Sequence, residues 1–293
     1  MGTHDLHLPD NHQDIVDRFV VACQADERIL AAFLGGSYAK GQADKFSDLD
    51  LFFITTDAAY EDFLAGRESF IRRLGEPLFL EDFGVPHGYL MIFSNGAEAE
   101  IWFGRESQFK NIYAGPYRVL LDKTGILAGE VFPMHAADQA RQVEVLRQQI
   151  DWFWHDMFHF IKAMGRGQLW FAYGELGVIR QICVNLARLK YNFSDAYLGD
   201  GEEPYFKVDE LLPVEQLLPL EGTCCPLEYN AMLQAARAIF RFYQAVAPAL
   251  AKAHGITYQV GLERMLIRKL EGDCFAKTAR NDDSSKKGGG YET

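Results

Sequence analysis

The sequence has few cysteines and no long hydrophobic run, and each absence excludes a class of protein. Its cysteines show no C-x-x-C spacing, and a reducing compartment fits them best. No apolar run approaches the roughly eighteen residues that a membrane-spanning helix needs, and no secretory signal opens the chain. We therefore expect a cytoplasmic protein without a membrane partner. The cysteines are Cys23, Cys183, Cys224, Cys225 and Cys274.

Basic residues are also in deficit. The chain has 29 Lys and Arg against 41 Asp and Glu, a net charge of −12, and long basic runs are missing. Stable binding to nucleic acid is therefore not expected, whereas an acidic surface favours a cationic small molecule. A hydrophobic content of 48% over 293 residues predicts a globular protein with room for two domains.

A glycine–serine turn after a short apolar run is the first candidate binding site. Ile29 to Leu34 is predicted to be a buried strand, and it ends at Gly35-Gly36, where a ligand can approach because there is no Cβ. Ser37 then begins a short helical segment, whose hydroxyl and free N–H groups would bind an anion. Lys40, one turn later, would add a positive charge. The pattern predicts a phosphate-binding turn.

Two aspartates one residue apart follow this turn. Asp48 and Asp50 precede and enter a predicted strand, Leu49 to Ile54, so both side chains are expected on one face. Adjacent carboxylates repel each other, and Mg²⁺ ions that bridge them to a triphosphate remove that repulsion. A lone Asp-x-Asp more often marks a turn, but the glycine–serine turn nearby favours a metal site. Together the two features indicate phosphoryl or nucleotidyl transfer.

The same residues resemble a known superfamily. Gly36-Ser37, ten residues, then Asp48-Leu49-Asp50 is similar to the signature of the polymerase-β-type nucleotidyltransferases. The local forms Gly-Ser-Tyr-Ala-Lys-Gly and Ser-Asp-Leu-Asp-Leu resemble its antibiotic-modifying branch, the streptomycin (aminoglycoside 6-) adenylyltransferases and lincosamide nucleotidyltransferases. The resemblance implies that Asp48 and Asp50 hold two Mg²⁺ ions and that Gly36 and Ser37 bind the phosphates of a nucleotide.

The resemblance also requires a third carboxylate on a neighbouring strand. Residues 88–93 and 97–103 flank Asn95-Gly96 and are predicted to form a β-hairpin. Glu98 and Glu100 share one face of its second strand, so alternation alone does not choose between them. Glu100 has apolar neighbours and follows the hairpin turn where the family's third acid does. We therefore expect Glu100 to complete the metal site or to act as a base, although the family often has aspartate there.

Helical patterns bracket these strands and then replace them. The strand pattern stops near residue 137, after which long amphipathic stretches predict helices and one segment predicts a loop with a short helix. The predicted helices are 11–25, 57–73, 138–164, 169–190, 227–253 and 258–270, the last predicted strand is 117–121, and the loop is 197–225.

We accordingly predict an α+β fold with a mixed β-sheet and flanking helices, followed by an α-helical bundle. Residues 1–135 would form the nucleotidyltransferase (catalytic) domain. Residues 136–275 would form the bundle that closes on the nucleotide and the acceptor, as the resemblance implies. Residues 276–293 are polar and are predicted to be a disordered tail.

One predicted helix carries a charged stripe on an otherwise apolar surface, so the stripe should face solvent or a polar cleft. The segment from Asp151 to Arg166 is similar to an aromatic helix of streptomycin adenylyltransferases that ends in a lysine. The resemblance implies that Lys162 reaches the triphosphate, helped by Lys40. The stripe consists of His155, His159, Lys162 and Arg166.

The segment from His155 to His159 also resembles the zinc-protease motif H-E-x-x-H. Asp156 stands where that motif has its glutamate, and it is one methylene too short to place a water in the same way. No third ligand follows at a familiar spacing. Two histidines that line a cleft or pack on aromatic rings are the better interpretation.

The sequence therefore predicts a metal-dependent nucleotidyltransferase. It would take ATP or another nucleoside triphosphate, transfer the nucleoside monophosphate to a hydroxyl of an aminoglycoside-like or lincosamide-like molecule, and release pyrophosphate. Two alternatives remain open: an acceptor hydroxyl on a protein, or a non-catalytic nucleotide-binding module. The sequence leaves open whether the chain is a monomer or a homodimer.

Overall fold

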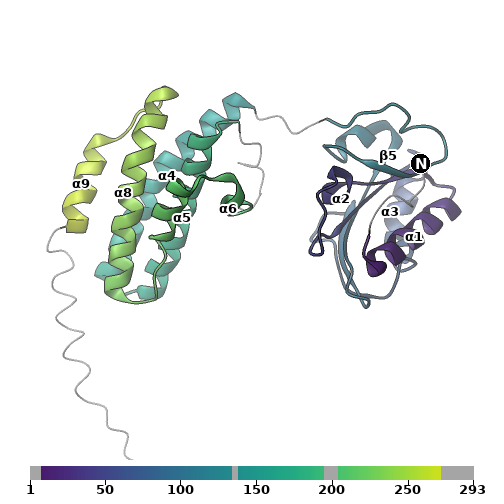
Figure 1. Cartoon of the computed structure of the whole chain (residues 1–293), viewed down its shortest axis with the longest axis horizontal. Coiled ribbons are helices and arrows are strands. Elements are labelled where there is room, and N and C mark those ends of the chain that lie inside the picture. Colours follow the sequence, from purple (N-terminus) through teal and green to yellow (C-terminus); the bar gives the residue numbers. More distant parts are fainter. Residues whose placement is uncertain (1–7, 134–137, 195–203, 272–293) are drawn as a thin grey trace, which may run out of the picture. The chain divides into compact units, whose positions relative to one another are not determined.

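The computed structural model describes residues 8–133, 138–194 and 204–271. The chain forms two compact units, residues 1–135 and 136–293, drawn in Figure 1. The first combines a β-sheet with helices, and the described part of the second is helical, so the predicted α+β class is confirmed. The predicted disordered tail, 276–293, and Cys274 lie outside the described residues.

One parallel strand pair sets the topology of the sheet. The six strands have the order β3–β4–β5–β2–β1–β6. Strands β2 and β5 run parallel, and every other neighbouring pair is antiparallel. Because a parallel pair needs a crossover, the chain passes through a helix and two further strands between β2 and β5. The strands are β1 (Ile29–Leu34), β2 (Leu49–Thr55), β3 (Pro77–Glu81), β4 (Gly88–Phe93), β5 (Glu98–Arg105) and β6 (Arg118–Asp122).

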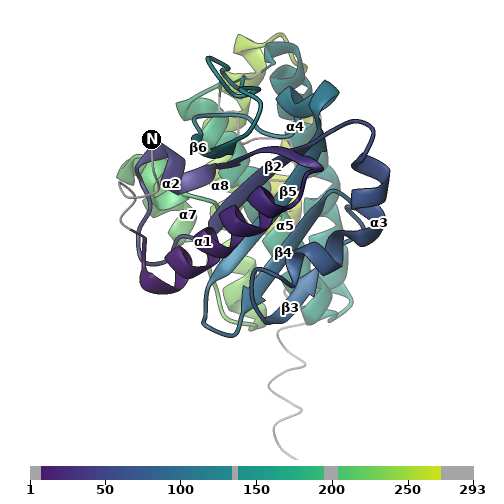
Figure 2. The ribbon, with the colours of Figure 1, turned by 90° about the vertical axis from the view of Figure 1, so that its right-hand side faces the viewer.

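Helices cover one face of this sheet, and an aromatic cluster covers the other. Helices α1 (Asp10–Ala25) and α3 (Tyr60–Ile71) pack on the face to which Leu51 and Phe53 of β2 point, and α1 lies across the strands in Figure 2. The opposite face carries Phe52 and Ile54, packed with the 3₁₀ helix η2 (Glu106–Asn111) and the segment after β6. The alternation of β2 therefore sends its odd-numbered residues to the helices.

The structure differs from the sequence predictions for this unit at one helix start and at one strand. The helix expected from Asp57 begins at Tyr60, and the Asp57 carboxylate instead accepts hydrogen bonds from the Ser107 N–H at 3.1 Å and hydroxyl at 2.9 Å. Asp57 thus stabilises the start of η2, which follows β5. Strand β3 was not predicted, because it is an edge strand whose Leu78 and Phe79 are exposed, so it lacks the alternation of a half-buried strand.

The second unit is built around three long helices, α4 (Gln139–Gly165), α5 (Leu169–Tyr191) and α8 (Tyr229–Ala253). Asp138 caps α4 by accepting from the N–H groups of residues 140 and 141. In the core, the rings of Phe153 and Tyr243 stack with centroids 3.6 Å apart. The Tyr243 hydroxyl donates to the Ile150 carbonyl at 3.1 Å, which joins α8 to α4.

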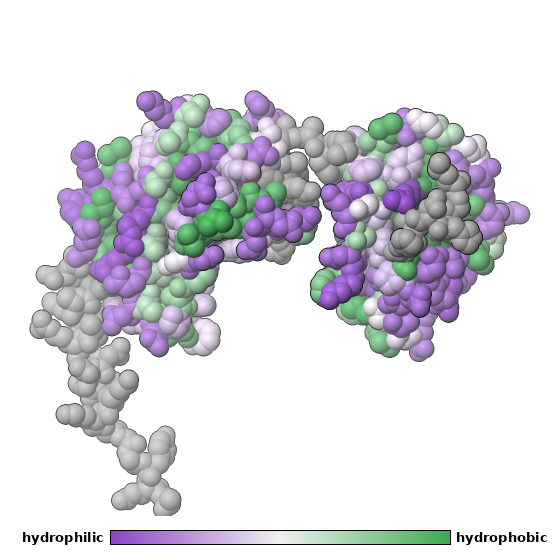
Figure 3. Space-filling model, viewed as in Figure 1, coloured by the Kyte–Doolittle hydropathy of each residue, from purple (hydrophilic) through white to green (hydrophobic). Residues whose placement is uncertain are grey.

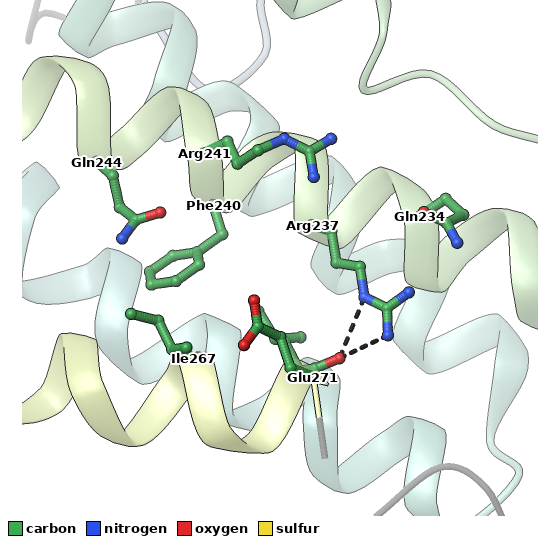
Figure 4. A pocket seen from close by; sticks show the side chains of 8 residues that line it. Gln234, Arg237, Phe240, Arg241, Gln244, Ile267 and Glu271 are labelled. Carbon is green, nitrogen blue, oxygen red and sulfur yellow. Dashed lines mark hydrogen bonds between the residues drawn. The ribbon is translucent and has the colours of Figure 1, made fainter. Parts of the chain in front are cut away.

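Shorter helices complete this unit: α6 (Val208–Leu211), α7 (Val214–Glu221) and α9 (Val260–Glu271). Between α8 and α9 lies a hollow of about 560 Å³, shown in Figure 4. There Arg237 donates twice to the Leu270 carbonyl, at 3.1 and 2.7 Å, and so holds the end of α9 against α8. None of the predicted site residues lines this hollow.

The visible surface of both units is largely hydrophilic, with hydrophobic patches between the charged side chains (Figure 3). Within the described ranges, every helix is either too short or too polar to span a lipid bilayer.

Candidate active site

The glycine–serine turn lies where β1 meets β2. The Gly35 N–H donates to the Asp50 carbonyl at 2.8 Å, which ties the turn to β2. Gly36 has φ +56°, and a Cβ built on it would lie 1.6 Å from the Asp50 Oδ2. Only glycine combines this left-handed backbone with such a close approach. The turn therefore lies directly against the Asp50 carboxylate.

The predicted anion-binding groups of the turn are only partly free. The Gly36 N–H donates to the hydroxyl of Tyr113 at 3.1 Å, so it differs from the free amide expected from the sequence. The Ser37 hydroxyl is buried and has no hydrogen-bond partner among the residues that the structure describes, which is costly unless a ligand supplies one. Lys40, at the end of the short helix α2 (Gly36–Lys40), is exposed.

The pairing of β2 with β5 brings two of the predicted acids together. Asp50 and Glu100 are register partners on these parallel strands, so their side chains leave the same face of the sheet. Asp48 immediately precedes β2. Glu100 is half-buried, and its Oε2 accepts from the Trp102 indole N–H at 3.1 Å. Glu98 is exposed, as expected of the alternative acid.

The charges of these residues are coupled. Burial, and then the negative charges of Asp48 and Glu100, raise the pKa of Asp50 to about 7, and Lys40 opposes this shift. Because Asp48 and Glu100 disfavour the ionised form of Asp50, a divalent cation bound among them would stabilise all three carboxylates.

The carboxylates are the type of ligand that suits magnesium, but they do not by themselves form a complete ligand set. Hard carboxylate oxygens are the ligands that Mg²⁺ prefers, and it commonly takes one or two from the protein and the rest from substrate phosphates and water. Across the described ranges, no three His, Cys, Asp or Glu side chains are already gathered as a full ligand set. The turn beside Asp50 is where triphosphate oxygens would complete the coordination.

Sequence reasoning missed a histidine and a tyrosine behind the site. The Nδ1 of His12, on α1, lies 2.7 Å from the Tyr38 hydroxyl, and both side chains are buried. Burial lowers the pKa of His12 below its usual value, and the negative charge of Asp48 partly opposes this shift. His12 is therefore close enough to interact electrostatically with the site. A lone histidine in an amphipathic helix gives no signal of this in the sequence.

The charged stripe of the second unit faces outward. Lys162 and Arg166 are exposed on α4, and the role of Lys162 toward a nucleotide stays a prediction. His155 and His159 lie with ring centroids 4.2 Å apart, and His155 Nδ1 is 2.7 Å from the neighbouring Asp156 Oδ1. His155 also contacts the ring of Trp152, which agrees with histidines packed on aromatics.

An acidic pair lies next to these histidines, between α4 and α5. The pKa of Glu175 is raised by burial and by Asp156, and the two histidines oppose that shift. Exposed aromatic rings contact the two histidines: Trp152, 54% exposed, contacts His155, and Phe171, 52% exposed, contacts His159. Aromatic faces beside carboxylates are suited to cationic groups.

Comparison with known proteins gives one extensive match. The family described as streptomycin adenylyltransferase matches residues 10–270. No curated protein matches the sequence.

Several solved structures are similar at low identity, including the following three. An aminoglycoside 6-adenyltransferase from Bacillus subtilis is 17% identical, with 88% of this chain and 95% of that chain covered and a TM-score of 0.40. A nucleotidyltransferase-like protein from Exiguobacterium sibiricum 255-15 is 11% identical (80% and 75% covered, TM-score 0.32). The cyclic dinucleotide synthase CdnE from Elizabethkingia meningoseptica is 16% identical (82% and 78% covered, TM-score 0.28). At these TM-scores the structural similarities add nothing to the family match.

Proposed function

Because this chain belongs to the streptomycin adenylyltransferase family and is thus a nucleotidyltransferase, we propose that it transfers AMP from ATP to a hydroxyl of a small cationic molecule and releases pyrophosphate. The observation that carries the proposal is the register of β2 with β5. It sets Asp50 opposite Glu100, beside a turn whose Gly36 leaves room for the Asp50 carboxylate.

Asp48, Asp50 and Glu100 are the residues that would hold magnesium. Two bound Mg²⁺ ions would neutralise charge on the triphosphate and polarise the phosphorus that is attacked. Asp50 must lose its proton to serve as a ligand. Because its pKa is about 7, the fraction of Asp50 that can bind metal changes with pH around neutrality. Its carboxylate lies beside Gly36, so the backbone of the turn would limit where this metal ligand can lie.

Phosphate binding would depend on the turn and on lysine side chains. The Ser37 hydroxyl has no hydrogen-bond partner among the described residues and can donate to a phosphate oxygen, while Gly36 leaves room for the Asp50 carboxylate beside that oxygen. Lys40 and Lys162, both exposed, would add positive charge to the triphosphate. Alignment and charge neutralisation would account for most of the rate enhancement.

Glu100 would act either as a metal ligand or as the base for the acceptor hydroxyl. Trp102 holds one of its carboxylate oxygens and leaves the other for a ligand or a proton. A base must lie within about 2.6–3.2 Å of the proton's oxygen, so a complex with acceptor decides between the two roles.

We assign the acceptor to the helical unit. Burial, and then the negative charge of Asp156, raise the pKa of Glu175, and a bound ammonium or guanidinium group would stabilise both carboxylates. Exposed Trp152 and Phe171, which contact the two histidines, would stack on the acceptor or on its cations. On this proposal residues 1–135 would be the catalytic domain and 136–275 the domain that closes on the nucleotide and binds the acceptor.

The test is a pyrophosphate-release screen with ATP and Mg²⁺ across aminoglycosides, lincosamides and simple hydroxyl acceptors. Asp48→Ala and Asp50→Ala should each lower the rate by more than ~10³-fold, which is over ~4 kcal/mol of transition-state stabilisation. Near-normal turnover in both variants would refute the assignment. Glu175→Gln should raise the KM for the acceptor and leave the KM for ATP unchanged.

The same experiment with labelled ATP separates the two alternatives. Label that accumulates on proteins of a cell lysate, and on none of the small molecules, would favour a protein-modifying enzyme. ATP binding that is independent of Mg²⁺, with no turnover on any acceptor, would favour a binding module.

A further inference from the structure

Tyr113 connects the aromatic face of the sheet to the glycine–serine turn. It lies between η2 and β6, far from the turn in sequence. Its hydroxyl accepts from the Gly36 N–H at 3.1 Å and donates to the Pro116 carbonyl at 2.8 Å. The proton of the hydroxyl is thus used within the protein, so Tyr113 is not placed as an acid or a base.

The ring of Tyr113 is fixed by its neighbours. Its centroid lies 4.7 Å from that of Phe52, 5.7 Å from that of Phe33 and 5.6 Å from that of Phe132. On the turn side it packs against Gly35, where a Cβ would lie 2.8 Å from the ring. The hydroxyl therefore cannot leave Gly36 unless the aromatic cluster rearranges.

Gly36 in turn determines where the Asp50 carboxylate can lie. The backbone of Gly36 is left-handed and close enough to Asp50 that any side chain there would overlap the carboxylate. A glycine also samples many other conformations, so the observed one needs a restraint. Among the residues that the structure describes, the Tyr113 hydroxyl is the side-chain group bonded to the Gly36 amide.

We propose that Tyr113 is a positioning residue, which holds Gly36 against Asp50 so that the carboxylate and the Ser37 hydroxyl stay aligned for metal and phosphate. This inference rests on the proposed function. It changes the part assigned to Gly36: with its amide bonded to Tyr113, Gly36 provides space, and Ser37 provides the free polar group.

The test compares Tyr113→Phe with Tyr117→Phe. Tyr117 belongs to the same aromatic cluster, near Phe33 and Phe132. Its hydroxyl also bonds to backbone carbonyls, those of Leu127 and Glu130, but not to the turn. Each variant removes one hydroxyl from the cluster, so a general loss of packing would affect both alike.

Two measurements are made on the full-length protein. Hydrogen–deuterium exchange without nucleotide should show faster exchange of residues 35–41 in Tyr113→Phe alone. With Mg²⁺ and ATP, kcat/KM for ATP should fall about tenfold in Tyr113→Phe. The KM for the acceptor should stay within about twofold, because the residues proposed to bind the acceptor are on α4 and α5.

Equal exchange of residues 35–41 in the two variants would overturn the inference, and so would equal values of kcat/KM. A wild-type protein that releases no pyrophosphate would instead refute the proposed function. The exchange data would then still decide whether Tyr113 holds the turn, so the two failures are distinguishable.

Discussion

At the scale of single residues, ionisation of Asp50 would favour metal binding but lowers the stability of the folded protein. As the proposed metal ligand, Asp50 would have to be ionised, yet burial and two neighbouring acids raise its pKa to about 7. A group whose pKa is raised in the folded state binds a proton more tightly there than in the unfolded chain. Stability therefore falls as pH rises from about 4 to 7, and the full penalty remains above pH 7.

At pH 8 the wild-type Asp50 is ionised, and Asp50→Asn removes that charge. The substitution should therefore stabilise the metal-free protein at this pH by on the order of 2 kcal/mol. The advantage should shrink steadily toward pH 4, because the wild-type carboxyl is then protonated. Urea unfolding with EDTA at several pH values measures this. Glu98→Gln, at an exposed position of β5, is the control, and an advantage independent of pH would contradict the prediction.

The spacing role of Gly36 gives a second prediction at this scale. Gly36→Ala would place a Cβ on the Asp50 carboxylate and should lower kcat/KM for ATP by at least about 10²-fold. Gly41 also has a left-handed backbone, φ +69°, but nothing lies within 4 Å of its Cβ position. Gly41→Ala should therefore cost about 1 kcal/mol of stability from backbone strain and keep its activity. Steady-state kinetics and thermal melts separate the two effects.

At the scale of elements, the register of β5 against β2 decides which glutamate belongs to the site. Glu100 is the partner of Asp50, whereas Glu98 is opposite Ile92 of β4 and exposed. Glu100→Gln should lower kcat by more than about 10²-fold, and Glu98→Gln should change it less than about twofold. The same pyrophosphate assay measures both, and equal losses would show that the register does not define the third acid.

Most elements were predictable because their patterns are long and regular. The run Ile29–Leu34 and the four long helical stretches of the second half matched the structure to within about two residues at each end. Strand β3 was not predictable, since an exposed edge strand carries no burial pattern. Asp57 misled the prediction because an acid at a predicted helix start can equally bond to a distant N–H, here that of Ser107.

Residue patterns alone could predict only the part of the site that lies in one short stretch of sequence. The nearness of the glycine–serine turn to Asp48 and Asp50 follows from their spacing in the sequence. Glu100 was expected from the family resemblance and its apolar neighbours, and its pairing with Asp50 comes from the register of β2 with β5. Tyr113 and His12 reach the turn through tertiary packing, and nothing in their sequence neighbourhoods indicates it.

At the scale of the whole molecule, binding of Mg²⁺ with a nucleotide should raise the melting temperature. A ligand at about 100 times its dissociation constant stabilises the folded state by about 2.7 kcal/mol. Thermal melts with α,β-methylene-ATP and Mg²⁺ measure this, and EDTA should remove most of the shift. Asp50→Asn should show no Mg²⁺-dependent shift, and an equal shift in that variant would place the nucleotide elsewhere.

The crossover between β2 and β5 has a consequence for how the protein is made. When the ribosome has released the chain through β2, the aspartates and the glycine turn are already present, but Glu100, which is fifty positions after Asp50, has not yet emerged. Strands β1 and β2 can thus pair while Asp50 is opposed by the charge of Asp48 but not yet by that of Glu100. The repulsion from Glu100 arises when β5 inserts beside β2, so part of the unfavourable charge around Asp50 is deferred until most of the sheet can compensate for it.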